Sequence, residues 1–137
     1  MTGPRMRYFT KLHFSNEQIT QYLNNASRDL EIAEESGRPE VKFNYAYTAL
    51  IKIGITLLAA MRNIKVRAIQ GHHAKVIAEM SDVLNDGSIE EIGNVMRMKR
   101  NQDLYSGGIF VSEKEASDYY GFVEKVFLKA KTLLKKK

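Results

Sequence analysis

Apolar side chains recur every three or four positions along five stretches of this chain, which is the spacing of one face of an α-helix. The five stretches are residues 16–35, 39–63, 72–84, 88–105 and 112–134. No stretch keeps a period of two together with the turn residues of a β-hairpin. The pattern therefore predicts an all-α protein, folded as an antiparallel up-and-down helical bundle.

Local signals at the ends of these stretches sharpen the predicted boundaries. Three helix starts carry the capping-box spacing, in which a serine and a Glu or Gln three residues later each accept a hydrogen bond from the other's backbone N–H. The pairs are Ser15 with Gln18, Ser88 with Glu91, and Ser112 with Glu115. Pro39 suits the first turn of the second helix, because its fixed φ is already helical.

The second helix has the widest apolar face, so we expect it at the centre of the bundle. Gly54 lies inside that face and costs about 1 kcal/mol of helix propensity, which indicates the close approach of a neighbouring helix. The apolar run from Ala46 to Met61 is interrupted by Lys52 and is shorter than the roughly 20 residues that span a bilayer. We therefore predict a buried helix.

Composition narrows the class of protein. The 137 residues fit a single domain, with residues 1–14 as an N-terminal extension and 135–137 as a basic tail. The chain has no cysteine and its first residues do not form a signal peptide, so we expect a soluble cytoplasmic protein. A net charge of +5 makes the surface slightly more attractive to phosphate, in a salt-dependent way.

The fourth helix places one charge on its apolar face. Steps of four from Met96 reach Arg100 and then Leu104, so a guanidinium lies on a line of otherwise apolar positions. A charge there needs a partner or a cleft that holds water. One interpretation is structural, with Arg100 reaching solvent or pairing with Asp103.

The residues around this arginine also form a motif. Arg100, Asn101 and Tyr105 spell Arg-Asn-x-x-x-Tyr near the end of the fourth predicted helix. This resembles a variant of the HEPN motif, in which an Arg, often followed by a polar residue, is separated from a His by roughly four to six intervening positions. HEPN domains are helical bundles with the motif late in the chain, so the resemblance covers nearly the whole sequence. His72 and His73, which follow a glycine, add to it.

The resemblance implies a homodimer in which two motif-bearing helices build a shared polar cleft. Many members are metal-independent endoribonucleases, in which the His assists attack of the ribose 2′-hydroxyl on phosphate and the Arg stabilises the developing charge. Carried over, Arg100 is the phosphate clamp and Asn101 a polar orienter. Tyr105 stands in the position of the His, and a phenol with a pKa of about 10 is a poor general base at neutral pH.

The resemblance also implies partners and a setting. These are RNA, or a nucleotidyltransferase that modifies a Tyr near the motif, in a toxin–antitoxin or defence system. We expect Arg97, Lys99 and Asp103 to help bind the substrate, and neither a cofactor nor a metal ion to be used. The alternative is a catalytically inactive module for dimerisation or protein interaction, with Arg100 in an interfacial hydrogen-bond network.

Two further groups have both a structural and a functional interpretation. His72 and His73 are adjacent and point about 100° apart on a helix, so helical spacing does not direct both to one metal ion. We expect one to pack or cap at the helix start and the other to be solvated. Five basic residues would form a rim for RNA phosphates if the second loop lies beside the fourth helix, and otherwise are solvated. They are Lys65, Arg67, Arg97, Lys99 and Arg100.

Overall fold

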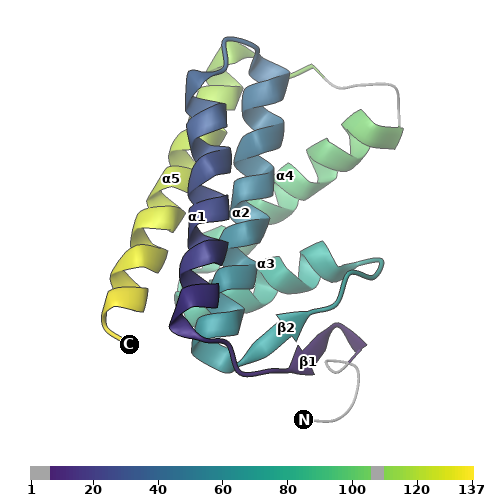
Figure 1. Ribbon diagram of the computed structural model, residues 1–137. Coiled ribbons are helices and arrows are strands. Elements are labelled where there is room, and N and C mark those ends of the chain that lie inside the picture. The colour runs from purple at the N-terminus through teal and green to yellow at the C-terminus, as the bar shows by residue number, and fades with distance from the viewer. Residues whose placement is uncertain (1–6, 106–109) are drawn as a thin grey trace.

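The computed structural model describes residues 7–105 and 110–137, with side chains inside the fourth helix as far as Gln102. Five helices and two short strands follow one another along the described chain (Figure 1). The predicted all-α bundle is confirmed. In chain order the elements are β1 (Phe9–Lys11), α1 (Asn16–Glu35), α2 (Pro39–Arg62), β2 (Ile64–Val66), α3 (His72–Val83), α4 (Gly87–Tyr105) and α5 (Glu113–Lys135).

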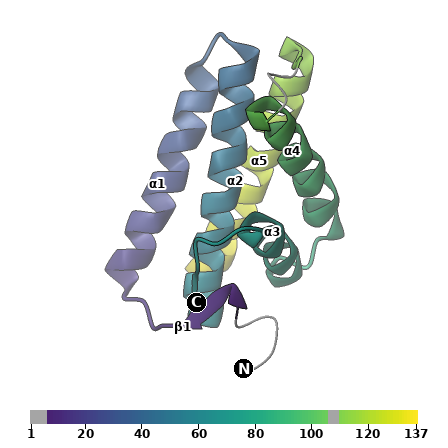
Figure 2. The ribbon, with the colours of Figure 1, turned by 90° about the vertical axis from the view of Figure 1, so that its right-hand side faces the viewer.

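Helix α2 is the centre of the molecule and contacts each of the other four helices. Helices α1, α2 and α5 run side by side along the length of the bundle, while α3 and α4 lie obliquely against it (Figures 1 and 2). A Cβ atom added at Gly54 would lie 2.5 Å from Val76 Cγ1 of α3, so the predicted close approach is confirmed. The glycine lets α3 pack directly on the backbone of α2.

Two of the three predicted capping boxes are confirmed, at Ser15 of α1 and Ser112 of α5. The prediction at the start of α4 is wrong. Helix α4 begins one residue earlier, at Gly87, and the carboxylate of Asp86 accepts from the backbone N–H of Ser88 at 3.0 Å and from its hydroxyl at 2.6 Å. A carboxylate is favoured at a helix N-terminus by its charge as well as by its hydrogen bond, so Asp86 takes the place of Ser88.

Strands β1 and β2 were missed by the sequence pattern. They pair antiparallel, with Phe9 opposite Val66, and bring the residues before α1 onto the bundle. Phe9 is only 1% exposed and forms a small apolar cluster with Leu58 and Ile64. Three residues are too few to show an alternating pattern in the sequence. The burial of Phe9 against Leu58 and Ile64 is what holds this segment in place as a strand. The described part of the N-terminal extension is therefore part of the fold.

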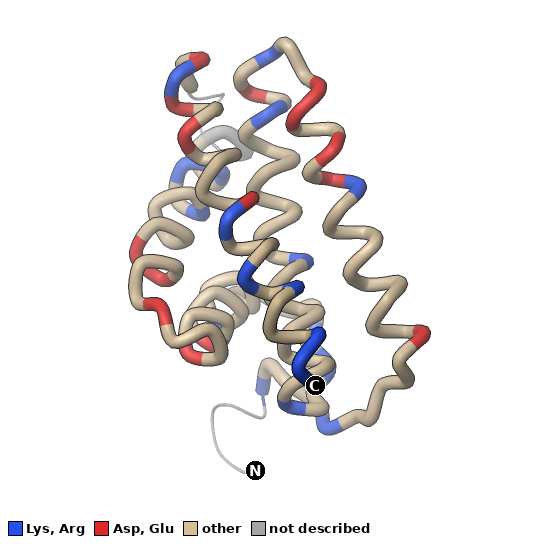
Figure 3. The backbone as a smooth tube through the Cα atoms, turned by 90° about the vertical axis from the view of Figure 1, so that its left-hand side faces the viewer, with Lys and Arg blue, Asp and Glu red and all other residues tan. Residues whose placement is uncertain are grey.

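Lys, Arg, Asp and Glu positions occur at both ends of the bundle and along its helices (Figure 3). Lysines gather toward the C-terminal end of α5, and acidic residues toward the C-terminal end of α1. Helix α2 is long and apolar enough to cross a membrane by composition, but 72% of that stretch is buried inside the protein. This fits the core helix of a soluble protein.

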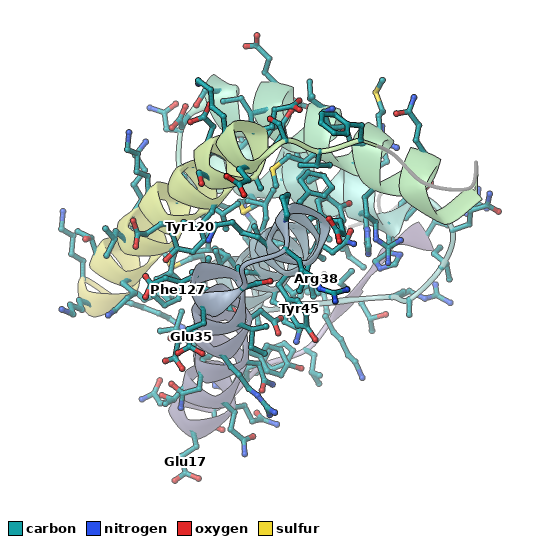
Figure 4. All side chains as sticks on the ribbon, turned by 90° about the horizontal axis from the view of Figure 1, so that it is seen from above. Glu17, Glu35, Arg38, Tyr45, Tyr120 and Phe127 are labelled. Carbon is teal, nitrogen blue, oxygen red and sulfur yellow. The ribbon has the colours of Figure 1, made fainter. Side chains whose placement is uncertain are left out.

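Aromatic side chains of α5 face the bundle. Viewed from above, Tyr120 and Phe127 lie toward α1, and Glu17 points out to solvent (Figure 4). The hydroxyl of Tyr120 donates to the carboxylate of Glu34 on α1 at 2.8 Å, and Phe127 packs against the main core. The predicted stripe along α5 thus serves packing between helices.

Candidate functional site

A polar pocket opens between the start of α3 and the C-terminal half of α4. These two segments lie on the same side of the molecule, at the right in Figure 1 and facing the viewer in Figure 2. The pocket has a volume of about 410 Å³. Its lining consists of Ile69, Gln70, Gly71, His72, His73, Ala74, Arg97 and Asn101. Among the described residues, the lining contains Arg97 and no Asp or Glu, so the side-chain charge in the pocket is positive.

The backbone at the start of α3 forms one wall of the pocket. Gly71 precedes the helix with a φ of 86°, in the left-handed region where residues with a Cβ are strained. No side chain hydrogen-bonds to the first turn as a cap. The uncapped N-terminus of α3 therefore presents its partial positive charge at the edge of the pocket.

His72 is held by the turn that leads into α3. Its Nδ1 lies 2.6 Å from the backbone carbonyl oxygen of Ile69, and its backbone N–H donates to that same oxygen at 3.1 Å. A carbonyl oxygen can only accept, so Nδ1 of His72 carries a proton and donates it. In the neutral ring, Nε2 is then a hydrogen-bond acceptor.

His73 is held instead by a tyrosine from the central helix. The hydroxyl of Tyr47, a side chain only 1% exposed, lies 2.9 Å from His73 Nδ1. Burial raises the pKa of Tyr47 to about 12, so the phenol keeps its proton. Among the described residues, Nδ1 of His73 is the acceptor within reach of this buried proton, so the hydroxyl donates to it. Nε2 of His73 then carries the proton of the neutral ring and is a donor, the opposite of His72.

Burial also determines the charge of His73. Burial first, then the charge of His72 when that ring is protonated, and then the charges of Arg100 and Arg97, together lower the pKa of His73 to about 4. The ring is therefore neutral at neutral pH. His72 and His73 pack edge to face, with ring centroids 4.3 Å apart. The prediction that one histidine packs at the helix start is confirmed. The prediction that the other is solvated is wrong, because both rings are half-buried and hydrogen-bonded.

Helix α4 supplies the opposite wall. Arg97 is half-buried and its Nε donates to Asn94 Oδ1 at 3.1 Å, which fixes the plane of the guanidinium. In the described part of the chain, no hydrogen bond holds its two terminal amino groups. Arg100, one turn further on, lies close enough for its charge to act on both Tyr47 and His73. Asn101 is exposed at the rim.

The structure brings only some of the predicted site residues together. Arg97 and Asn101 line the pocket and Arg100 lies beside it, whereas Lys99 turns away, with its ammonium 3.4 Å from the carboxylate of Glu115 on α5. Lys65 and Arg67 do not line the pocket either. The side chains of Asp103 and Tyr105 lie outside the described part of the structure.

Sequence reasoning did not connect the two histidines with the arginines. The signal available was Gly71, which starts a helix with His72 and His73, but their distance from Arg97 along the chain concealed the contact. Among the described residues, no group of three or more His, Asp, Glu or Cys side chains could hold a metal ion. The charged and titratable groups of the pocket are hydrogen-bond donors apart from His72 Nε2, an acceptor whose ring is fixed by the backbone, while the amides of Gln70 and Asn101 can donate or accept.

Comparison with known proteins adds no assignment to this geometry. The chain matches no family model, no curated protein and no solved structure. The chemistry of the pocket is set by its side chains. Two guanidinium groups, the N–H of His73 and an uncapped helix start together suit an anionic, oxygen-rich group such as phosphate.

Proposed function

We propose that this protein binds RNA in the pocket between α3 and α4, with a backbone phosphate held by Arg97 and Arg100. The observation that carries the proposal is the position of these arginines. Arg97 lines the pocket with its terminal amino groups unbonded within the described chain, and the charge of Arg100 reaches the same place. A planar guanidinium binds two phosphate oxygens at once, which an ammonium does not.

The rest of the pocket suits a nucleotide as the source of this phosphate. With no carboxylate in its lining, the pocket repels no part of a strand. Its volume of about 410 Å³ accommodates a group of the size of one nucleotide, and the rings of His72 and His73 offer faces for a base to stack on. The net charge of +5 attracts the strand from a distance.

The test is RNA binding by an Arg97→Ala variant, measured by fluorescence anisotropy with a labelled single-stranded RNA of about 12 nucleotides. Loss of one phosphate contact should weaken binding about 10-fold at low salt and lower the slope of log Kd against log salt by about 1. An Arg97→Lys variant should lie between the two, because it keeps the charge and loses the fork.

Lys99→Ala is the matched control. It removes a positive charge from the same helix two residues away, but its ammonium pairs with Glu115 outside the pocket. RNA affinity should change less than 2-fold, because only the general attraction of the surface is reduced. Equal losses in the Arg97 and Lys99 variants, or no RNA binding by the native chain, would reject the proposal and favour the inactive interaction module.

Other features implied by the HEPN resemblance concern properties beyond this pocket. They are the homodimer, the nucleotidyltransferase partner, the toxin–antitoxin setting, metal-independent RNA cleavage and a cytoplasmic location. We keep them as predictions. In the expected dimer, Val95 and Met98 of α4, which are 45% and 57% exposed, are apolar side chains that a second copy could cover.

A further inference from the structure

We infer that His72 makes the pocket selective for RNA over DNA, by accepting a hydrogen bond from the ribose 2′-hydroxyl next to the bound phosphate. The inference rests on the proposed function, because it assigns a second contact to a strand that Arg97 and Arg100 already hold. It concerns a residue outside the Arg-Asn-x-x-x-Tyr motif. It is based on which of the two ring nitrogens of His72 carries the proton.

The orientation of the His72 ring is fixed by the backbone. Its Nδ1 donates to the carbonyl of Ile69 at 2.6 Å, and the backbone N–H of His72 donates to the same oxygen at 3.1 Å. Both contacts are local to the turn that enters α3. They leave Nε2 with its lone pair on a half-buried side chain that lines the pocket. This is a preformed acceptor, so a ligand does not pay to orient it.

The charged and titratable neighbours in the pocket are of the opposite kind. Arg97 in the lining and Arg100 beside it are donors only, and His73 presents a donor because Tyr47 occupies its Nδ1. These groups match phosphate oxygens, which only accept. The amides of Gln70 and Asn101 also line the pocket, and both side chains are exposed. His72 Nε2 needs a donor, and phosphate at neutral pH does not provide one.

RNA provides that donor in the right place and DNA does not. The 2′-hydroxyl lies on the sugar whose 3′-oxygen bears the phosphate, so a phosphate on α4 brings a hydroxyl to the same pocket. A neutral hydrogen bond of this kind changes affinity by about 5-fold. The pocket therefore reads the sugar with His72 and the phosphate with the arginines.

The test compares three labelled oligonucleotides of one sequence: RNA, DNA and RNA with 2′-fluorine. The 2′-fluoro strand keeps the sugar pucker of RNA and lacks the hydroxyl donor. The native protein should bind RNA about 5-fold more tightly than either of the other two. In His72→Phe, which keeps a flat ring, RNA should bind about as weakly as 2′-fluoro RNA.

Two variants control for indirect effects. His13→Phe changes a histidine that is exposed and does not line the pocket, so its RNA preference should equal that of the native protein. His72→Gln restores an acceptor and should recover part of the preference. Far-UV circular dichroism checks that each variant keeps its helices, and the native protein with 2′-fluoro RNA gives the same test without a variant.

The outcomes separate this inference from the proposed function. If Arg97→Ala weakens binding but the native protein binds RNA and 2′-fluoro RNA equally, the role of His72 is wrong and the phosphate site stands. The role of His72 is also wrong if His72→Phe weakens all three strands alike. If Arg97→Ala has no effect, both ideas fall together.

Discussion

Helices α2 and α3 meet in two regions that are held in different ways. At one, Gly54 lies against Val76 and Met80, and the contact depends on the absence of a side chain. At the other, the buried hydroxyl of Tyr47 meets His73, and the contact depends on a single oxygen atom. The first region fixes the distance between the helices, and the second fixes the rotation of a ring at the start of α3.

The difference shows how a helical bundle carries a polar pocket. Close packing at Gly54 positions the body of α3 without any polar group, and is insensitive to pH. The histidines at the N-terminal end are then oriented by hydrogen bonds, which specify the protonated nitrogen as well as the position. The apolar region should respond most to added volume, and the polar region to lost atoms and to protons.

The largest effect is expected from Gly54→Ala. The new Cβ would lie 2.5 Å from Val76 Cγ1, and a β-branched side chain on a helix has little freedom to move away. Overpacking should exceed the gain in helix propensity and lower the free energy of unfolding by about 2 kcal/mol. Urea unfolding followed by circular dichroism measures this change.

Gly121→Ala is the matched control. Gly121 lies in α5, and a Cβ atom there would meet nothing within 4 Å. Only helix propensity changes, so this variant should be more stable than the native protein by about 0.5–1 kcal/mol. Stabilisation by both substitutions would show that α2 and α3 do not pack as closely as described.

Tyr47→Phe tests the polar region and should have the next largest effect. The ring stays and only the hydroxyl is lost, so the cost is that of leaving His73 Nδ1 without its partner in a half-buried site. We expect a loss of about 1–1.5 kcal/mol in the free energy of unfolding. Tyr45→Phe, on the exposed side of the same helix, should change it by less than about 0.5 kcal/mol. Equal values for the two variants would contradict the described hydrogen bond.

The sequence predicted those features that neighbouring residues determine. The capping boxes at Ser15 and Ser112, the helix start at Pro39 and the packing role of Gly54 each depend on a few adjacent residues or on one helix face. The Ser-x-x-Glu spacing led to the wrong prediction that Ser88 caps α4, whereas the carboxylate of Asp86, two residues earlier, is the group that caps it. Both signals are local, and the sequence analysis chose the weaker one.

The features that the sequence did not predict depend on tertiary contacts. Strand β1 pairs with a strand that lies more than fifty residues later, and three residues carry no period. The pocket brings His73 of α3 beside Arg97 of α4, with Tyr47 of α2 hydrogen-bonded to His73, and no spacing rule relates these three residues. The motif on the fourth helix led the sequence analysis to Arg97 and Asn101, which line the pocket. It also predicted Lys99 there, because the sequence does not show that Glu115 of α5 lies close enough to pair with Lys99.

A smaller effect, and the one most specific to the polar region, is the pH dependence of stability. The pKa of His73 is about 4 in the folded protein and 6.5 for an unperturbed side chain, because burial disfavours the charged ring. As the pH falls through 6.5, the unfolded chain binds a proton that the folded protein does not. Stability is therefore complete above about pH 6.5 and is lost progressively toward pH 4.

Because the His73 side chain is only half-buried, the loss between pH 7.5 and pH 5 should be about 1 kcal/mol after allowance for solvent screening. Urea unfolding at the two pH values measures it, and His73→Asn should remove this component, since an amide does not titrate. His13→Asn, which replaces an exposed histidine, should leave the pH dependence unchanged. Because the pKa of His73 is about 4, its ring also stays neutral in RNA-binding measurements made near pH 7. If the native protein and His73→Asn lost the same stability on acidification, the His73 ring would not be buried as described.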